Sequence, residues 1–139
     1  MRTVSKSLRL PEDVARELDF QAMRQKRAFA SVVEEYLREA IATRRYRHVV
    51  FVGIEGDRRA HLAGSSLDVW EIAMLLESVE GDVSRLRLLL DTTPSEQLDE
   101  ALRYLHDHPE EIAQRLDINR YYSDETVQTL LPRPITRPE

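Results

Sequence analysis

The first residues of the chain combine a short alternating pattern with a proline stop, and this limits what the chain can fold into. Within residues 3–10 apolar and polar positions alternate. One face carries Val4, Leu8 and Leu10 with the stem of Lys6, and the other carries Thr3, Ser5, Ser7 and Arg9. A period of two predicts a β-strand with one buried face. Pro11 cannot donate to a ladder, and Glu12 and Asp13 follow it, so we expect the strand to end and a helix to begin there.

Two amphipathic helices follow the strand. Apolar residues recur every four positions from Val14 to Ala22 and predict a helix that ends near Gln25. A short basic turn comes next, and then an apolar stripe runs from Phe29 to Ile41 at a spacing close to 3.6 residues. This stripe predicts a second helix that ends near residue 45.

A lone strand followed by two helices is incomplete in a single chain. The strand has unpaired N–H and C=O groups along both edges, and the helical stripes have no sheet to cover. Two copies remove both faults, because their strands can pair into an antiparallel ribbon above a shared four-helix core. Leu8 and Leu10 would then face that core, while Ser5, Ser7 and Arg9 would lie on the free face. The sequence predicts a homodimer and leaves open whether dimers assemble into tetramers or larger particles.

A two-stranded ribbon has the size of the DNA major groove, which is about 12 Å wide. Arginine can donate two hydrogen bonds to guanine, and serine can donate or accept at several bases. We therefore expect Ser5, Ser7 and Arg9 to contact bases. The N-terminus of the second helix would meet a backbone phosphate, where free N–H groups favour an anion and where Lys26 and Arg27 add positive charge.

The charge distribution is compatible with this interpretation. Residues 1–50 hold 11 Lys/Arg against 7 Asp/Glu, whereas residues 51–139 hold 9 against 18. The net charge of −5 therefore divides into a basic first part and an acidic second part. A basic part is suited to nucleic acid, and an acidic part is suited to another partner, although a local excess of this size is also common on ordinary solvated surfaces.

The segment from Ser5 to Ile41 resembles the ribbon-helix-helix family of Arc, MetJ and CopG repressors, most specifically in the run LRLPEDV. The resemblance implies base contacts from the strand and a phosphate clamp at the start of the second helix. The family often has Gly and then Ser or Thr before that helix, whereas this chain has Lys-Arg-Ala, so Ser31 is a candidate replacement cap. The expected phosphate contacts are Thr3, Lys26, Arg27, Ala28, Phe29, Ala30 and Ser31.

Beyond residue 46 the pattern changes to a hairpin and short helices. Residues 48–52 and 58–62 predict two strands around a turn at residues 55–57. Asp68 and Asp82 are expected helix caps, and prolines 94 and 109 mark two further helix starts. The expected fold is mainly α: a ribbon-helix-helix unit over residues 1–46, then a short β-hairpin and a small three- to four-helix, helix-turn-helix-like domain over residues 47–120. Residues 121–139, which contain three prolines, are expected to form an extended tail.

The second region resembles the small helical domain of VapB-type antitoxins in residues 58–76 and 98–112. Such domains accompany a PIN-like nuclease toxin. The resemblance implies a type II antitoxin that represses its own operon and neutralises the toxin through its C-terminal half. The helix that begins at Ser95 carries acids in its first turns, which would repel phosphate, so we expect this half to bind protein. The expected partner contacts are Tyr121, Tyr122, Leu130 and Leu131, and a tail without a specific role is the alternative.

Catalysis has little support in the sequence. We find no Gly-rich phosphate loop, nucleophile with a placed base or ligand cluster, and His106 and His108 do not share a helix face. We therefore expect no enzyme activity, cofactor or metal. The sequence has no cysteine and no long apolar run, so we expect a cytoplasmic protein with no membrane partner. A stand-alone transcriptional regulator and a pure protein-binding adaptor are the rival functions.

Overall fold

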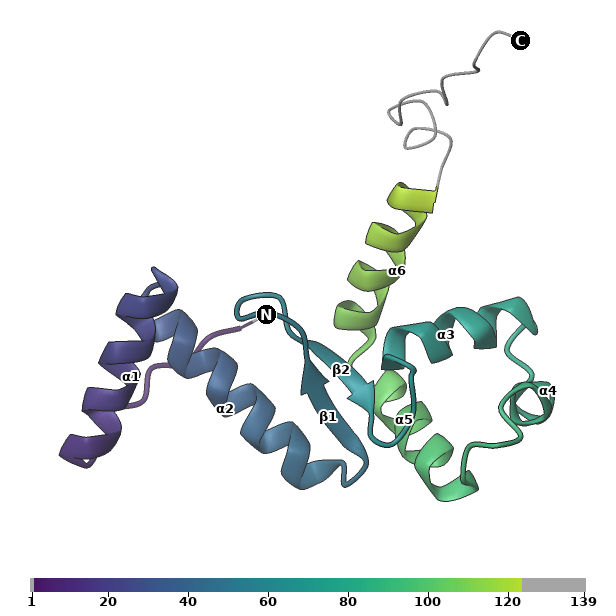
Figure 1. Cartoon of the computed structure of the whole chain (residues 1–139), viewed down its shortest axis with the longest axis horizontal. Helices are drawn as coiled ribbons and strands as arrows, with labels where there is room; N and C mark the ends of the chain where they lie inside the picture. The colour runs from purple at the N-terminus through teal and green to yellow at the C-terminus, as the bar shows by residue number, and fades with distance from the viewer. Residues whose placement is uncertain (1, 124–139) are drawn as a thin grey trace, which may run out of the picture.

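The computed structural model describes residues 2–123 and is mainly helical within that range, with one small antiparallel hairpin (Figure 1). Helices α1 and α2 lie together at one end, the hairpin is in the middle, and α3 to α6 form the other end. The elements are α1 (Glu12–Gln25), α2 (Phe29–Arg45), β1 (Val49–Val52), β2 (Arg59–Leu62), α3 (Val69–Ser78), α4 (Val83–Leu89), α5 (Ser95–Asp107) and α6 (Pro109–Ser123). None of the described helices is long and apolar enough to cross a bilayer.

The two N-terminal helices begin and end where the sequence predicts. Helix α1 follows Pro11 and ends at Lys26, whose φ of 53° lies in the left-handed region. Helix α2 has Ala28 as its N-cap residue, with no side-chain cap. Ser31 lies inside the first turn, where its backbone N–H donates to the Ala28 carbonyl at 3.1 Å. The expectation that Ser31 replaces the missing hydroxyl cap is therefore wrong, because the helix starts two residues before it.

Residues 2–11 form neither helix nor strand in the single chain. Among the described residues, positions 2–10 take no part in a backbone hydrogen bond or strand pairing. An isolated strand has no edge to pair with, so one copy cannot form the expected ribbon. The strand prediction for residues 3–10 consequently stays a prediction about two copies.

The hairpin has the positions that the sequence predicts, to within a residue. Strands β1 and β2 are antiparallel, with Val49 opposite Leu62 and Val52 opposite Arg59. The connecting loop needs glycine at Gly53, whose φ is 104° and whose added Cβ would lie only 2.8 Å from the Asp57 carbonyl oxygen. The loop is thereby bent into a fixed shape, and it points toward α1 and α2 (Figure 1).

A continuous core joins α2 to the second half of the chain. Tyr46, directly after α2, is completely buried, and its ring meets that of Tyr104 edge-on at 5.0 Å. The cluster around them draws on α2, both strands, α3, α5 and α6: Ala42, Tyr46, Val49, Ala60, Val69, Ala73, Tyr104, Ile112 and Leu116. Residue 46, where the first unit was expected to end, is therefore packed inside this cluster.

The second half has a core of its own and predictable helix caps. Leu62, Ile72, Val79, Leu86, Leu98 and Ala101 are buried together. Asp68 and Glu71 form a reciprocal capping box at α3, and the Asp82 side chain accepts from two amides of α4, so both predicted caps are confirmed. Residues 121–123 form the last turn of α6 rather than the start of an extended tail. The helix continues because neither Gly nor Pro interrupts the sequence from residue 110 to 123.

Candidate nucleic-acid interface

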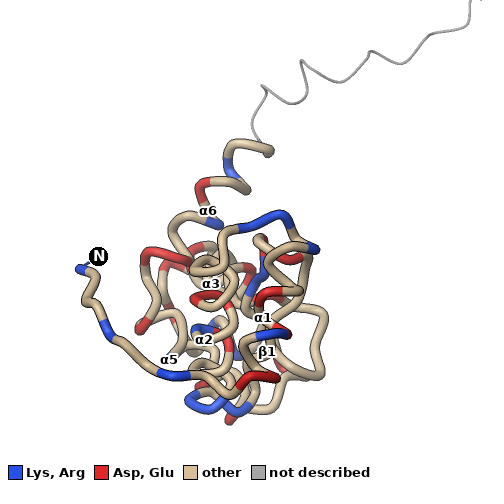
Figure 2. The backbone as a smooth tube through the Cα atoms, turned by 90° about the vertical axis from the view of Figure 1, so that its left-hand side faces the viewer, with Lys and Arg blue, Asp and Glu red and all other residues tan. Residues whose placement is uncertain are grey.

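The N-terminal segment exposes the side chains that we expected to read bases. Ser5, Ser7 and Arg9 are exposed, as is Thr3, and none has a side-chain partner within the described part of the chain. Figure 2 shows this segment running clear of the helices, with basic positions along it. These side chains are therefore accessible, whichever ligand they meet.

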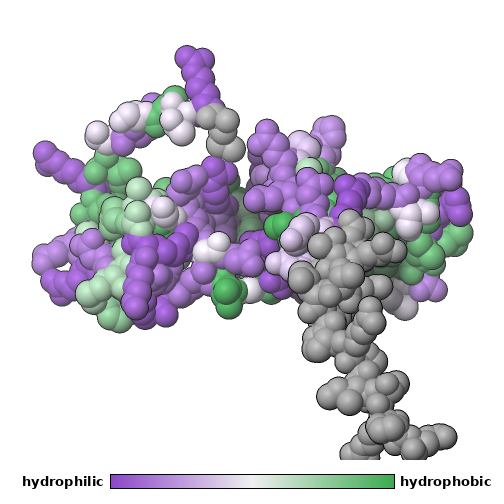
Figure 3. Space-filling model, turned by 90° about the horizontal axis from the view of Figure 1, so that it is seen from above, coloured by the Kyte–Doolittle hydropathy of each residue, from purple (hydrophilic) through white to green (hydrophobic). Residues whose placement is uncertain are grey.

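The apolar side of the same segment is also exposed. Val4 is 74% exposed and Leu8 is 71% exposed. Several large apolar side chains of α1 and α2 are exposed as well, and in Figure 3 hydrophobic surface gathers over the end of the molecule that these helices occupy. They are Val14, Phe20, Met23, Phe29, Leu37 and Ile41. Exposed apolar surface gathered at one end of a molecule is typical of an interaction surface.

The start of α2 has free donors. Among the described residues, the backbone N–H groups of Ala28, Phe29 and Ala30 donate no hydrogen bond. Ala28, Ala30 and Ser31 are exposed, and the Phe29 side chain is half exposed. Lys26 is exposed beside them and has no ion-pair partner within residues 2–123. Free amides, the helix dipole and one free cation together favour an anion here.

Arg27 differs from the other expected phosphate contacts. Its Nη1 lies 3.1 Å from an oxygen of Glu35 and 2.9 Å from the side-chain oxygen of Gln25. Both partners of the ion pair are largely shielded, with 24% and 16% of their side chains exposed. The guanidinium also lies against Gly56 of the hairpin loop. Arg27 therefore joins the N-terminal helices to the hairpin, a role that sequence reasoning missed.

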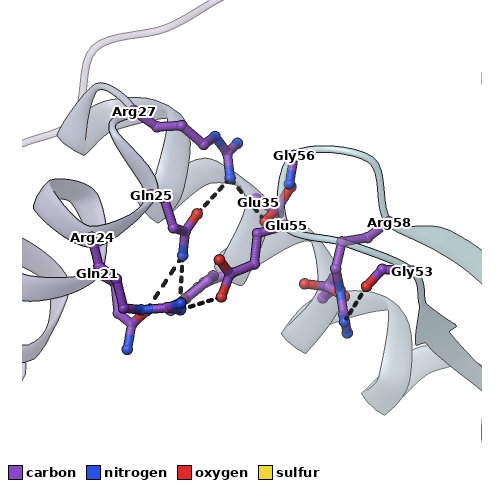
Figure 4. A network of polar contacts seen from close by, with 11 residues as sticks. Gln21, Arg24, Gln25, Arg27, Glu35, Gly53, Glu55, Gly56 and Arg58 are labelled. Atoms are coloured by element: carbon purple, nitrogen blue, oxygen red, sulfur yellow. Dashed lines mark hydrogen bonds and ion pairs between the residues drawn. The ribbon is translucent and has the colours of Figure 1, made fainter.

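The hairpin loop is tied to α1 and α2 by charged contacts (Figure 4). Arg24 at the end of α1 forms an ion pair with Glu55. Glu35 accepts from the Gly56 N–H at 3.1 Å, and Arg58 donates to Glu39 at 2.7 Å. The loop thus lies beside the α1–α2 turn, next to the free amides of α2.

Two buried carboxylates hold the hairpin to the C-terminal helices. Asp68 lies 2.6 Å from Arg59 and 2.8 Å from the His61 ring, and it accepts from the Trp70 ring N–H at 3.1 Å. Burial alone would raise the pKa of Asp68, but these hydrogen bonds outweigh it and hold that pKa below its ordinary value. The Trp70 indole also packs against the core.

Glu100 has a comparable role on α5. One oxygen accepts from the His48 backbone N–H at 3.0 Å, and the other lies 2.9 Å from the His48 ring. Burial again opposes ionisation, yet the bonds to His48 keep the pKa of Glu100 below its ordinary value. The sequence analysis missed both carboxylate partners of the hairpin histidines, Glu100 for His48 and Asp68 for His61.

The histidine near the end of α5 is part of an aromatic cluster. His108 stacks on Tyr104 with ring centroids 4.2 Å apart, and the Tyr46 hydroxyl donates to Asp107 at 2.5 Å. Burial, and then this bond, raise the pKa of Tyr46 to about 12. The described residues contain no group of three or more potential metal ligands. The ring contacts and the Tyr46–Asp107 hydrogen bond hold the end of α2 against α5 and the start of α6.

The expected partner contacts are described only in part. Tyr121 and Tyr122 lie in the last turn of α6, where they are 59% and 65% exposed and meet edge-on at 5.4 Å. Ile118 and Met74, on α6 and α3, are also partly exposed. Leu130 and Leu131 lie outside the described residues.

The structure thus brings the expected clamp residues together at the α1–α2 turn and leaves the expected base-reading residues on a separate, exposed segment. No protein-family model, curated protein or solved structure matches the chain.

Proposed function

We propose that the protein is a dimeric DNA-binding regulator of the ribbon-helix-helix kind. Residues 3–10 of two copies would pair into an antiparallel ribbon that enters the major groove. The observation that carries this proposal is the exposure of both faces of residues 3–10 together with the apolar side chains of α1 and α2. A single chain offers that surface no cover.

Dimerisation accounts for this exposure in energetic terms. Completely burying a Val or Leu side chain contributes about 1.5–3 kcal/mol. Val4 and Leu8 are each exposed over more than two thirds of their surface, and Val14, Leu37 and Ile41 are each exposed over about half. Covering these side chains in two protomers would offset a large part of the cost of ordering the two strands.

DNA recognition then divides between two sets of groups. Ser5, Ser7 and Arg9 read bases from the free face of the ribbon, and the open amides of Ala28 to Ala30, with Lys26, hold a backbone phosphate. Arg27 supports the turn through Glu35 instead of meeting the phosphate directly.

We further propose that the protein is the antitoxin of a type II toxin–antitoxin pair, in which the acidic C-terminal half binds a PIN-like nuclease. The exposed Tyr121 and Tyr122 support a protein contact there, since tyrosine is frequent at the centre of interfaces. A stand-alone regulator is the alternative. Co-expression with the neighbouring reading frame separates the two, because only an antitoxin forms a stable complex with a nuclease encoded there and abolishes its RNA cleavage.

The DNA assignment is tested by Arg9→Ala, with Arg16→Ala as its control. Arg16 lies on the same unit but is a highly exposed α1 residue paired with Glu12. Removing a bidentate hydrogen-bonded pair with a base costs about 1–3 kcal/mol per site. Fluorescence anisotropy with the duplex upstream of the protein's own gene should therefore show weaker binding for Arg9→Ala and little change for Arg16→Ala. Equal affinities for the two variants would reject base reading by Arg9.

A further inference from the structure

The three cations at the α1–α2 turn are in three different states. Lys26 is exposed with no partner among the described residues, and Arg27 is shielded with Glu35. Arg24 is paired with Glu55, and nearly half of each of these two side chains is exposed. Arg24 is therefore the cation whose carboxylate partner a solvent-borne anion can reach and replace.

Glu55 belongs to a loop that other contacts hold in place. The Gly56 N–H donates to Glu35, Arg58 donates to Glu39, and Arg115 of α6 donates to Asp57 at 2.6 Å. Figure 4 shows Glu55 reaching from this loop to Arg24 on the neighbouring helix. Because the loop has these other anchors, removing the Glu55 carboxylate takes away the counter-charge of Arg24 without releasing the loop.

Exchange of a phosphate for Glu55 is chemically favourable. An exposed carboxylate–guanidinium pair contributes little net stability. A guanidinium binds a phosphate through two parallel hydrogen bonds, and that pairing gains further from the release of counterions from DNA. Arg24 lies in the last turn of α1, two residues before Lys26, so its charge is at the same turn as the open amides of α2.

We propose that Arg24 is a further phosphate-binding residue of the DNA interface, and that Glu55 occupies its guanidinium when DNA is absent. This proposal rests on the proposed function. The acidic hairpin loop then lowers the affinity for DNA, because each protomer must release a carboxylate before its Arg24 can meet the backbone.

The test uses the full-length protein and a fluorescein-labelled random-sequence DNA duplex, titrated by anisotropy over a series of NaCl concentrations. The variants are Glu55→Gln, Arg24→Gln and the double variant. Glu34→Gln is the matched control, because Glu34 also forms an exposed ion pair, with Arg38 on α2, and its change removes the same charge.

Glu55→Gln is expected to tighten low-salt binding by about threefold to tenfold in a dimer, since two exposed pairs no longer compete. Arg24→Gln is expected to weaken binding and to reduce the salt slope by about 0.9 for each DNA phosphate that the variant no longer neutralises. In the Arg24→Gln background, Glu55→Gln should have no more effect than Glu34→Gln.

Two results would overturn the inference while leaving the proposed function intact. The first is DNA binding in which Glu55→Gln equals Glu34→Gln, and the second is an Arg24→Gln variant with an unchanged salt slope. If none of the variants nor the wild type binds the duplex at the lowest salt, the proposed DNA-binding function fails, and the inference fails with it.

Discussion

The turn between α1 and α2 contains a backbone conformation that its residue does not favour. Lys26 has φ 53° and ψ 42°, and it ends α1 in a Schellman arrangement. The Arg27 N–H donates to the Ala22 carbonyl at 3.1 Å, and the Lys26 N–H donates to the Met23 carbonyl at 3.2 Å. This left-handed conformation costs about 1–2 kcal/mol for a residue with a Cβ, and glycine avoids that cost.

Replacing Lys26 by glycine should therefore stabilise the protein, and Lys26→Ala is the matched control. Both variants remove the same charge and side chain, but only alanine keeps the Cβ. Glycine also loses more backbone entropy on folding, by about 0.5–1 kcal/mol, so the expected net gain over alanine is about 0.5–1 kcal/mol.

The assay is urea unfolding at one fixed protomer concentration, because a dimer's stability depends on concentration. A Lys26→Gly variant with a higher urea midpoint than Lys26→Ala, at the same m-value, is the expected result. A glycine variant no more stable than the alanine variant would refute the reasoning, since the left-handed conformation would then carry no penalty at this turn.

Two further predictions concern the contacts that hold the two halves of the chain together. The folded-state pKa values of Asp68 and Glu100 lie below their unfolded values. Their contribution to the free energy of unfolding is therefore complete above about pH 5 and is lost as the pH falls through the lower folded pKa values. The urea midpoint should drop on acidification, and it should drop less in the Glu100→Gln variant. Tyr46→Phe removes a buried hydroxyl that donates to Asp107 and should cost about 1–2 kcal/mol by thermal or urea unfolding, whereas an unchanged midpoint would show that this bond does not hold α2 in place.

Local patterns in the sequence predict most of the elements. Helical periodicity and Pro11 place α1, and the apolar stripe after residue 28 places α2. Asp68 and Asp82 are recognised as caps because capping depends on residues only two or three positions away. Such short-range rules apply before any tertiary contact is known. The predicted end of α6 is too early because its hydrophobic pattern is weak, although its residues still favour a helix.

The charged contacts between elements could not be predicted in the same way. Arg24 and Glu55 are 31 positions apart, and His48 and Glu100 are 52 apart. No periodicity links such residues, because their meeting depends on how the hairpin folds back against the helices. Arg27 illustrates the consequence: its sequence position suggested a phosphate contact, yet Glu35, two helical turns along α2, holds its guanidinium.

The central claim is that two copies of residues 3–10 pair into one ribbon. Amide hydrogen exchange of these residues, followed residue by residue at several protein concentrations, tests it most directly. Paired strands should protect alternate amides between Val4 and Leu10 from exchange. Diluting the protein until the dimer dissociates into single chains of 16.2 kDa should abolish that protection. Exchange at the rate of an unstructured peptide at every concentration, in a protein that still binds its DNA, would contradict the account.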